Sequence, residues 1–512
     1  MANQQEFFDH ITKGYTSKGD SITLGAAMLD GETITNALVN VPLKTLNRHG
    51  LIAGATGTGK TKTLQILAEN LSEKGIPVLL MDMKGDLSGI AQPSPGHAKI
   101  DERHEKIGIP FNAQKFPVEI LTLSEQPGVR LRATVSEFGP VLISRILNVS
   151  ETQAGIISVL FKYCDDNKLP LLDLKDFKKL LQYATGDGKA EIAEQYGRIS
   201  PASSGAILRK IVELEQQGGD LFFGEKSFDT DDLLRIDENG MGYINIVRLT
   251  DIQDRPKLFS TFMLCMLAEI YSTFPEQGDS GRPELVIFID EAHLIFKEAS
   301  DALLDQIESI VKLIRSKGVG IYFVTQNPTD VPDAVLSQLG LKIQHALRAF
   351  TAKDRKAIKL TAENYPISEY YKTDEVLTSL GIGEALVSVL NEKGIPTPLA
   401  ATMLRAPMSR MDVLTEDELK DLLGKSKIST AYNEEIDRES AYEMLNKKIE
   451  IAHKEEAKEK AEEEKAAAKR ATSRRSSSSS RSRSSSKGAL EKMLTSPTII
   501  RSVLGILSKL IK

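Results

Sequence analysis

Short apolar runs alternate along the chain with longer stretches in which apolar residues recur every three or four positions. The apolar runs lie at 50–53, 76–82, 242–247, 284–290 and 321–326. Each has the length of a buried β-strand, and helical spacing follows the first run at 63–71 and precedes the fourth at 257–271. Continuously apolar strands that are separated by helices form parallel sheets with both faces covered. The pattern therefore predicts an α/β fold with a mainly parallel sheet.

Changes in this periodicity indicate how the chain is divided. Residues 1–45 contain two short strand-like runs around the turn Asp30-Gly31, and they predict a short β-rich segment. Residues 130–235 show mostly helical spacing, which predicts a helical insertion. This insertion separates the two halves of the sheet-forming domain, at 46–129 and 236–405.

Beyond residue 405 the sequence becomes polar and charged. Residues 406–470 predict a helical extension, of which 441–470 is one long run rich in Ala, Glu and Lys. Residues 471–488 are almost entirely Ser and Arg and predict a low-complexity linker, because this composition cannot bury a core. Residues 489–512 place their apolar residues on one side of a basic amphipathic helix.

Charge is distributed unevenly between the body and the tail. The segment 469–512 holds 11 Lys and Arg and one Glu, so it carries +10, whereas the whole chain carries −6. The remainder therefore carries −16, and an acidic body with a basic tail results.

The composition also favours a cytoplasmic protein with no integral membrane segment. The first residues show no signal-peptide pattern, and no apolar stretch is long enough to span a bilayer. Cys164 and Cys265 lie far apart in apolar helical surroundings. They predict buried free thiols in a reducing compartment.

Residues 54–61 fit the pattern G-x-x-x-x-G-K-[ST] of the phosphate-binding loop, or P-loop, of NTPases. An apolar strand precedes this loop and a helix follows it, as the function of the loop requires. Lys60 is expected to reach the β- and γ-phosphates, and the Thr61 hydroxyl to ligate Mg²⁺. The residues expected to bind the nucleotide are Gly54, Ala55, Thr56, Gly57, Thr58, Gly59, Lys60, Thr61 and Lys62.

A second motif follows the apolar strand at 284–290. Asp290 and Glu291 stand at its carboxyl end, where the ligands of open α/β sheets bind. Asp290 is expected to hold Mg²⁺ through water, and Glu291 to polarise the attacking water. Adjacent carboxylates and the lack of an Asn-Lys-x-Asp motif favour ATP over GTP. His293 is interpreted as a helix cap.

Several other polar residues are candidates for the same site. Gln326 ends the strand at 321–326, where it either contacts the γ-phosphate or attacking water or is a plain strand-end residue. Arg315 is a candidate to stabilise charge on the nucleotide of its own or a neighbouring subunit, and Arg348 is a weaker one. Arg48 is either a further candidate or a surface residue. A final group, favoured less, ends a strand placed two positions from the P-loop strand: Asp82, Lys84 and Asp86.

Four segments together resemble the HerA/FtsK superfamily of ATP-driven DNA motors. They are RHG-LIAGATGTGKT at 48–61, IDEAH at 289–293, IRSKGVGIYFVTQNP at 314–328 and QHALRAFTAKDRKA at 344–357. The likeness is greatest to the bacterial helicase HerA-like, or YjgR-type, proteins. It extends over about residues 20–405, and so over the whole expected NTPase body.

The resemblance implies a RecA-like core, a homo-oligomeric hexameric ring, ATP hydrolysis at subunit interfaces and double-stranded DNA in the central channel. By motif position, Lys60 and Thr61 match the P-loop of the family, and Asp290 and Glu291 its carboxylate pair. The remaining matches are the sensor residue Gln326, the preceding Arg315, and Arg48, which the family can offer across the interface.

Two features depart from the family pattern. HerA-type helicases carry a full β-barrel that docks a nuclease, whereas about 45 residues precede the P-loop here, which argues against a nuclease partner. The net negative charge of the body does not indicate a DNA-binding channel, although a ring needs only a few Lys or Arg residues per subunit on its inner rim. Two main hypotheses stay open: a DNA motor, and an ATPase of the same fold that remodels or signals to a protein partner. A third hypothesis, a non-enzymatic assembly protein with a vestigial site, disagrees with the intact motifs.

Overall fold

The computed structural model describes residues 4–278, 280–297, 301–349, 351–434, 436 and 438–476, without the side chains of 256, 301–303 and 470–476. The chain divides into two compact units, Met1–Leu445 and Asn446–Lys512. The first, called unit 1 below, contains the sheet and all the candidate site residues.

Unit 1 is built on a sheet of 12 strands, in the order β2-β1-β12-β11-β10-β3-β9-β8-β4-β7-β5-β6. The strands are β1 (Ser21–Leu29), β2 (Glu32–Pro42), β3 (Gly50–Ala53), β4 (Val78–Asp82), β5 (Val118–Thr122), β6 (Val129–Arg130), β7 (Ile244–Arg248), β8 (Leu285–Ile289), β9 (Val319–Thr325), β10 (Leu341–His345), β11 (Glu384–Ser388) and β12 (Ala400–Leu404). Every pair from β10 to β6 is parallel, and the pairs from β10 to β2 are antiparallel. The predicted α/β class with a mainly parallel sheet is confirmed.

The central strands are apolar throughout because helices cover both of their faces. Every residue of β3, β8 and β9 is buried, which explains why these strands stand out in the sequence. The helices around the sheet are α1 (Gln4–Tyr15), α2 (Lys60–Glu73), α3 (Ala98–Ile107), α10 (Pro256–Thr273), α11 (His293–Lys297), α12 (Asp301–Leu313), α13 (Asp333–Leu336), α14 (Ala352–Glu363), α15 (Thr373–Ser379), α16 (Glu416–Gly424) and α17 (Ser429–Asn433). Short 3-10 turns lie at Leu43–Arg48, Ser88–Ala91, Thr230–Leu234, Ile314–Lys317 and Pro328–Asp330.

The N-terminal region adds a helix and a hairpin to the edge of this sheet. β1 and β2 form the hairpin around Asp30-Gly31, and β1 pairs with β12. Helix α1 precedes them, and only its three residues Phe7, Ile11 and Tyr15 are buried. Because such a narrow apolar stripe lies in a polar stretch, the sequence pattern did not single out this helix.

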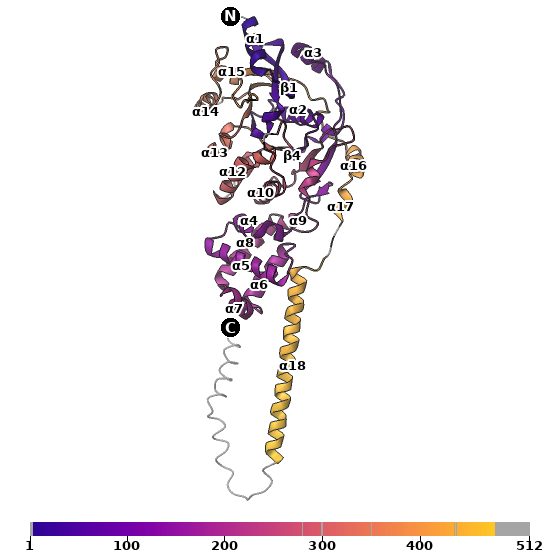
Figure 1. Cartoon of the computed structure of the whole chain (residues 1–512), viewed down its shortest axis with the longest axis vertical. Helices are drawn as coiled ribbons and strands as arrows, with labels where there is room; N and C mark the ends of the chain where they lie inside the picture. The colour runs from indigo at the N-terminus through magenta and orange to yellow at the C-terminus, as the bar shows by residue number, and fades with distance from the viewer. Residues whose placement is uncertain are drawn as a thin grey trace. The chain divides into compact units, whose positions relative to one another are not determined.

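A cluster of helices lies between β6 and β7 in the chain, and Figure 1 shows it gathered at one end of unit 1. It consists of α4 (Val135–Ile146), α5 (Glu151–Asn167), α6 (Leu174–Thr185), α7 (Lys189–Tyr196), α8 (Pro201–Gln216) and α9 (Gly219–Phe222). Ser150 and Asp173 cap α5 and α6 through their side-chain oxygens. Cys164 in this cluster and Cys265 in α10 are both free thiols.

The last described element is α18 (Ala441–Ser476), most of which belongs to the second unit. It continues past the predicted end at residue 470, since Ala471, Arg474 and Arg475 are good helix formers. The remainder of the predicted linker and the predicted amphipathic helix at 489–512 lie outside the described residues. Among the helices that are described, none combines the length and the apolar character needed to cross a bilayer.

Candidate active site

The P-loop joins β3 to α2 at the carboxyl edge of the parallel strands. Gly59 has a φ of +112° immediately before the first helical residue, Lys60, and only glycine adopts this conformation without strain. Gly54 also has a positive φ, and a Cβ there would lie 2.5 Å from the Cβ of His345. Glycine is thus required at both ends of the loop, by backbone conformation and by the close approach of β10.

Lys60 lies in the curve of this loop. Its side chain is buried, and Nζ donates hydrogen bonds to the carbonyl oxygens of Gly54, at 2.7 Å, and Ala55, at 3.2 Å. Burial, followed by the positive charge of Lys84, lowers the pKa of Lys60. The ammonium therefore stands where the loop closes around an anion, and the loss of solvent strengthens its attraction for phosphate.

Residues distant in sequence support the loop from behind. The Gly383 amide donates to the Thr58 carbonyl over 3.0 Å, and the Thr63 hydroxyl lies 2.9 Å from His345 Nε2. Burial, assisted by the charge of Lys60, lowers the pKa of His345 to about 4, so the imidazole is neutral at pH 7. Sequence reasoning assigned no role to His345 or Gly383. Only the likeness of the segment 344–357 to a known family pointed to the region of His345.

Asp290 and Glu291 follow β8 at the same edge of the sheet. Asp290 is buried, and its Oδ1 accepts a hydrogen bond from the Glu291 amide over 2.9 Å. Its other oxygen, Oδ2, has no hydrogen-bond partner, and burial raises the pKa of the carboxyl group. A buried carboxylate oxygen of this kind is a suitable ligand for a hard cation such as Mg²⁺, directly or through water.

Glu291 has a backbone conformation unusual for a residue with a side chain. Its φ is +48°, in the left-handed region, and such strain is typical of functional sites. His293, at the start of α11, places Nδ1 3.3 Å from Glu291 Oε2. His293 therefore faces the carboxylate as well as beginning the helix.

Lys84 extends into the carboxylate pair from the loop after β4. Its Nζ lies 2.7 Å from Glu291 Oε1 and 3.5 Å from Asp290 Oδ2. Asp82, by contrast, accepts hydrogen bonds from the backbone amides of Gly85 and Leu87, and so holds the loop together. The predicted position of this strand was wrong, because both β9 and β8 lie between β3 and β4. β4 is instead the direct neighbour of β8, and Lys84 consequently lies beside Asp290 and Glu291.

Gln326 follows β9, which lies between the P-loop strand β3 and β8. It is exposed, and it lines a cavity of about 390 Å³ together with Ala55, Thr56 and Arg348. This cavity therefore brings the expected sensor residue and one candidate arginine to the first residues of the P-loop.

Arg315 and Arg48 lie at the amino ends of the parallel strands, opposite the end that carries the P-loop. Arg315 precedes β9 and Arg48 precedes β3, whereas the P-loop follows the last residue of β3. The seven residues of β9 at about 3.3 Å each place Arg315 roughly 20 Å from that edge. Burial, with a smaller effect of the Arg315 charge, lowers the pKa of His49 to about 4. Neither arginine meets the P-loop of its own chain.

Lys62, the last predicted nucleotide-binding residue, points away from the loop toward the segment after β12. Its Nζ donates to the carbonyl oxygen of Met411 over 2.6 Å and lies 3.3 Å from Gln65 Oε1. The same segment is fixed to α2 by Glu69, whose carboxylate accepts hydrogen bonds from the amides of Met408 and Ser409. Lys62 thus contributes to holding this segment over the start of α2.

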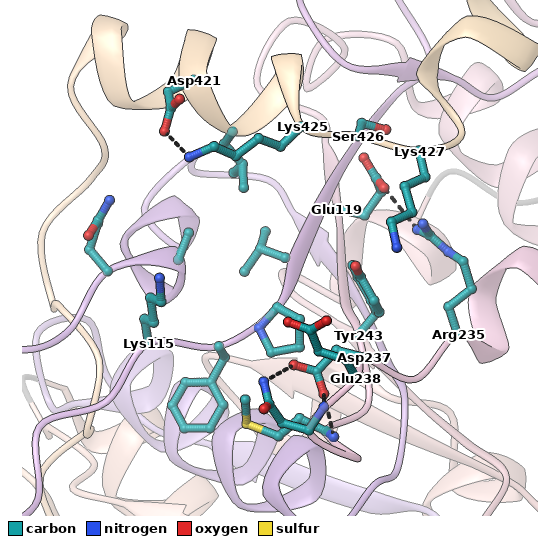
Figure 2. Close-up of a pocket in the computed structure, with 18 of the residues that line it drawn as sticks. Lys115, Glu119, Arg235, Asp237, Glu238, Tyr243, Asp421, Lys425, Ser426 and Lys427 are labelled. Carbon is teal, nitrogen blue, oxygen red and sulfur yellow. Dashed lines mark hydrogen bonds and ion pairs between the residues drawn. The ribbon is translucent and has the colours of Figure 1, made fainter.

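A separate cleft of about 790 Å³ lies near the amino ends of β5 and β7, and Figure 2 shows it below α16. Charged residues of both signs line it, but several are already paired. Arg235 meets Glu119 at 2.9 Å, and Lys425 meets Asp421. It contains none of the motif residues, and we assign the nucleotide to the P-loop edge.

Comparison with known proteins agrees with this geometry. Residues 28–512 match the family model described as helicase HerA-like C-terminal. The DNA double-strand break repair helicase HerA of Sulfolobus acidocaldarius is 23% identical over 396 residues, covering 75% of this chain and 71% of that protein. The protein of the same name from Saccharolobus solfataricus is 23% identical over 390 residues, with 75% and 69% coverage.

Two solved structures resemble the fold. The bacterial conjugative coupling protein TrwBdeltaN70, in its unbound form, has a TM-score of 0.51 and 16% identity, covering 80% of this chain and 94% of that one. The plasmid coupling protein TrwB in complex with ADP and Mg²⁺ has a TM-score of 0.50 and 16% identity, with 79% and 100% coverage. At this identity the likeness concerns the fold alone.

Proposed function

We propose that the chain, which belongs to the helicase HerA-like family of P-loop ATPases, is an ATP-driven motor acting on duplex DNA. The observation that carries the proposal is the carboxylate pair Asp290 and Glu291, whose side chains are 3% and 12% exposed and which stands at the same sheet edge as Lys60 in its P-loop. Phosphoryl transfer depends mainly on holding such groups around the nucleotide.

The residues divide the work of hydrolysis among them. Backbone amides of the P-loop hold the phosphates, and Lys60 lies across the β- and γ-phosphates. Thr61 and Asp290 would hold Mg²⁺, which would neutralise phosphate charge, and the Oδ2 of Asp290, which accepts no hydrogen bond, fits this role. Gln326 orients the attacking water.

Glu291 is the proton acceptor in this scheme. The water oxygen bonds to the γ-phosphorus while the bond from that phosphorus to the β–γ bridging oxygen breaks. The water proton passes to the Glu291 carboxylate, and ADP leaves with the bridging oxygen. One ATP and one water yield ADP, inorganic phosphate and a proton.

The position of Arg48 and Arg315 supports assembly into a ring. Both lie at the edge of the sheet away from their own P-loop, so each would reach a nucleotide only on a neighbouring subunit. A homo-oligomer in which the two edges face each other completes every site, and we propose the hexameric ring that the family resemblance implies.

Duplex DNA is proposed as the substrate of the motor. The helicases that match this chain act on DNA according to their names, and TrwB is named as a conjugative coupling protein. The acidic body, with −16 outside the basic tail, is the observation that favours the alternative, an ATPase acting on a protein partner.

Duplex binding in the presence of a non-hydrolysable ATP analogue separates the two functions. A DNA motor should bind a blunt duplex with an affinity that falls steeply between about 50 and 200 mM salt, since phosphate contacts release counterions. If no duplex binding occurs at 50 mM salt with the analogue bound, the protein-remodelling function replaces the DNA motor.

A further inference from the structure

Lys84 is the least buried member of the carboxylate cluster. Its side chain is 40% exposed, whereas the side chains of Asp290 and Glu291 are 3% and 12% exposed. The backbone near it is anchored, because Asp82 accepts from the Gly85 and Leu87 amides and Gln253 donates to the Met83 carbonyl. The backbone of the loop is therefore fixed, whereas the Lys84 side chain has room to move.

The ion pair occupies the oxygen that hydrolysis requires. Lys84 Nζ lies 2.7 Å from Glu291 Oε1, and His293 stands beside the other carboxylate oxygen. A carboxylate that is held by a cation is not free to turn toward a water molecule. Glu291 is thus restrained in the described arrangement.

Lys84 Nζ lies 2.7 Å from Glu291, the residue that the proposed mechanism places against the water that attacks the γ-phosphate. The charge of Lys84 is the second cause, after burial, of the low pKa of Lys60, so the two ammonium groups affect each other across the site. A phosphate with several negative charges, entering between these two lysines, would compete with Glu291 for Lys84.

We propose that Lys84 is a γ-phosphate-sensing positioning residue, which leaves Glu291 for the γ-phosphate when ATP binds and thereby frees Glu291 to accept the water proton. The exchange is a change of ion-pair partner and alters no covalent bond. It rests on the proposed ATPase function, and it gives the site a way to distinguish ATP from ADP, because only ATP carries the competing phosphate.

The test compares nucleotide affinities of Lys84→Met, Lys84→Arg and the wild-type protein, with Lys115→Met as a matched control. Lys115 is an exposed lysine in the cleft of Figure 2, whose lining includes none of the motif residues. Binding of ADP and of a non-hydrolysable ATP analogue is measured by titration calorimetry with Mg²⁺ present, and turnover is measured with ATP.

Lys84→Met should bind ADP as the wild type does but lose about tenfold or more in affinity for the ATP analogue, since one charge-assisted contact is removed. Its turnover should fall by a similar factor or more, while Lys84→Arg recovers part of both and Lys115→Met changes neither. Equal loss of affinity for both nucleotides would mean a merely structural role and would overturn the proposal, as would an unchanged ratio of the two affinities.

These outcomes are distinct from a failure of the proposed function. If the wild type hydrolyses ATP and Lys84→Met does so equally well, the role of Lys84 is wrong and the ATPase stands. If the wild type hydrolyses no ATP under any condition, the ATPase function is wrong, and the ratio of analogue to ADP affinity still decides whether Lys84 senses the γ-phosphate.

Discussion

The Thr63 hydroxyl and His345 Nε2 lie 2.9 Å apart, and this buried hydrogen bond joins the first turn of α2 to the end of β10. Because α2 begins in the P-loop, the bond couples the loop to a strand that lies beside β3 in the sheet. The imidazole is fully buried, so its protonation state is tied to folding.

His345 makes the free energy of unfolding decrease as the pH is lowered. Its pKa is about 4 in the folded chain and about 6.5 in an unfolded one, so the unfolded state binds more protons between these values. Stability should therefore drop by about 2 kcal/mol through this residue from pH 7 to pH 5. Raised carboxyl pKa values, such as that of Asp82, about 6, act in the opposite direction.

The contribution of His345 is isolated by comparing urea unfolding of the wild type and His345→Gln at the two pH values. The glutamine keeps a polar partner for Thr63 but does not titrate. The variant should lose about 2 kcal/mol less than the wild type on acidification. Parallel losses in the two proteins would show that His345 is not the group that titrates.

Glu69 fixes the segment after β12 to α2, and its removal should be costly. The carboxylate is fully buried and accepts from the amides of Met408, at 2.7 Å, and Ser409, at 3.0 Å. Glu69→Ala leaves both donors buried without a partner and should destabilise unit 1 by about 2–4 kcal/mol. Glu73→Ala, one turn later on an exposed position, is the control and should cost under about 1 kcal/mol. Similar melting temperatures for the two variants would contradict this account.

Substitutions of Lys60 and Glu291 should separate nucleotide binding from ATP turnover. Lys60→Ala removes the cation in the P-loop and should abolish or nearly abolish nucleotide binding. Glu291→Gln keeps the shape of the side chain but cannot accept a proton, so it should bind ATP normally and stop hydrolysis. Equilibrium binding and phosphate release check the two expectations. Substantial hydrolysis by Glu291→Gln would move the proton acceptor elsewhere.

The placement of Arg315 predicts complementation between inactive subunits. Arg315→Ala and Lys60→Ala should each be inactive as pure oligomers. In a mixed ring, an Arg315→Ala subunit keeps its own P-loop, and a neighbouring Lys60→Ala subunit supplies the missing arginine. Phosphate release should therefore reappear on mixing. If mixtures at all ratios stay inactive, although mass spectrometry shows mixed oligomers, the arginine does not act across an interface.

The parts of the fold that could be predicted from the sequence are those governed by local chemistry. β3, β8 and β9 are buried on both faces, so their sequences are almost entirely apolar. The P-loop was recognisable because its glycines and Lys60 must stand at fixed spacing. Helix α1 was missed because only Phe7, Ile11 and Tyr15 of its residues are buried.

The rest of the site depends on strand order, which a single sequence does not specify. Lys84 belongs to the site only because β4 lies next to β8, and the expected order had placed it elsewhere. His345 and Gly383 contact the P-loop from nearly 300 residues or more away in the chain, with no local motif to mark them. The side of the sheet on which Arg315 lies likewise follows from the direction of β9.

The central claim, that ATP hydrolysis at Lys60, Asp290 and Glu291 drives a motor on duplex DNA, is tested most directly by the ATPase rate with and without duplex DNA across a salt series. The account predicts that duplex DNA raises the rate several-fold at low salt, and that this stimulation disappears steeply as salt increases. Glu291→Gln should show no rate under either condition. A wild-type rate that is the same with and without DNA at low salt would contradict the claim.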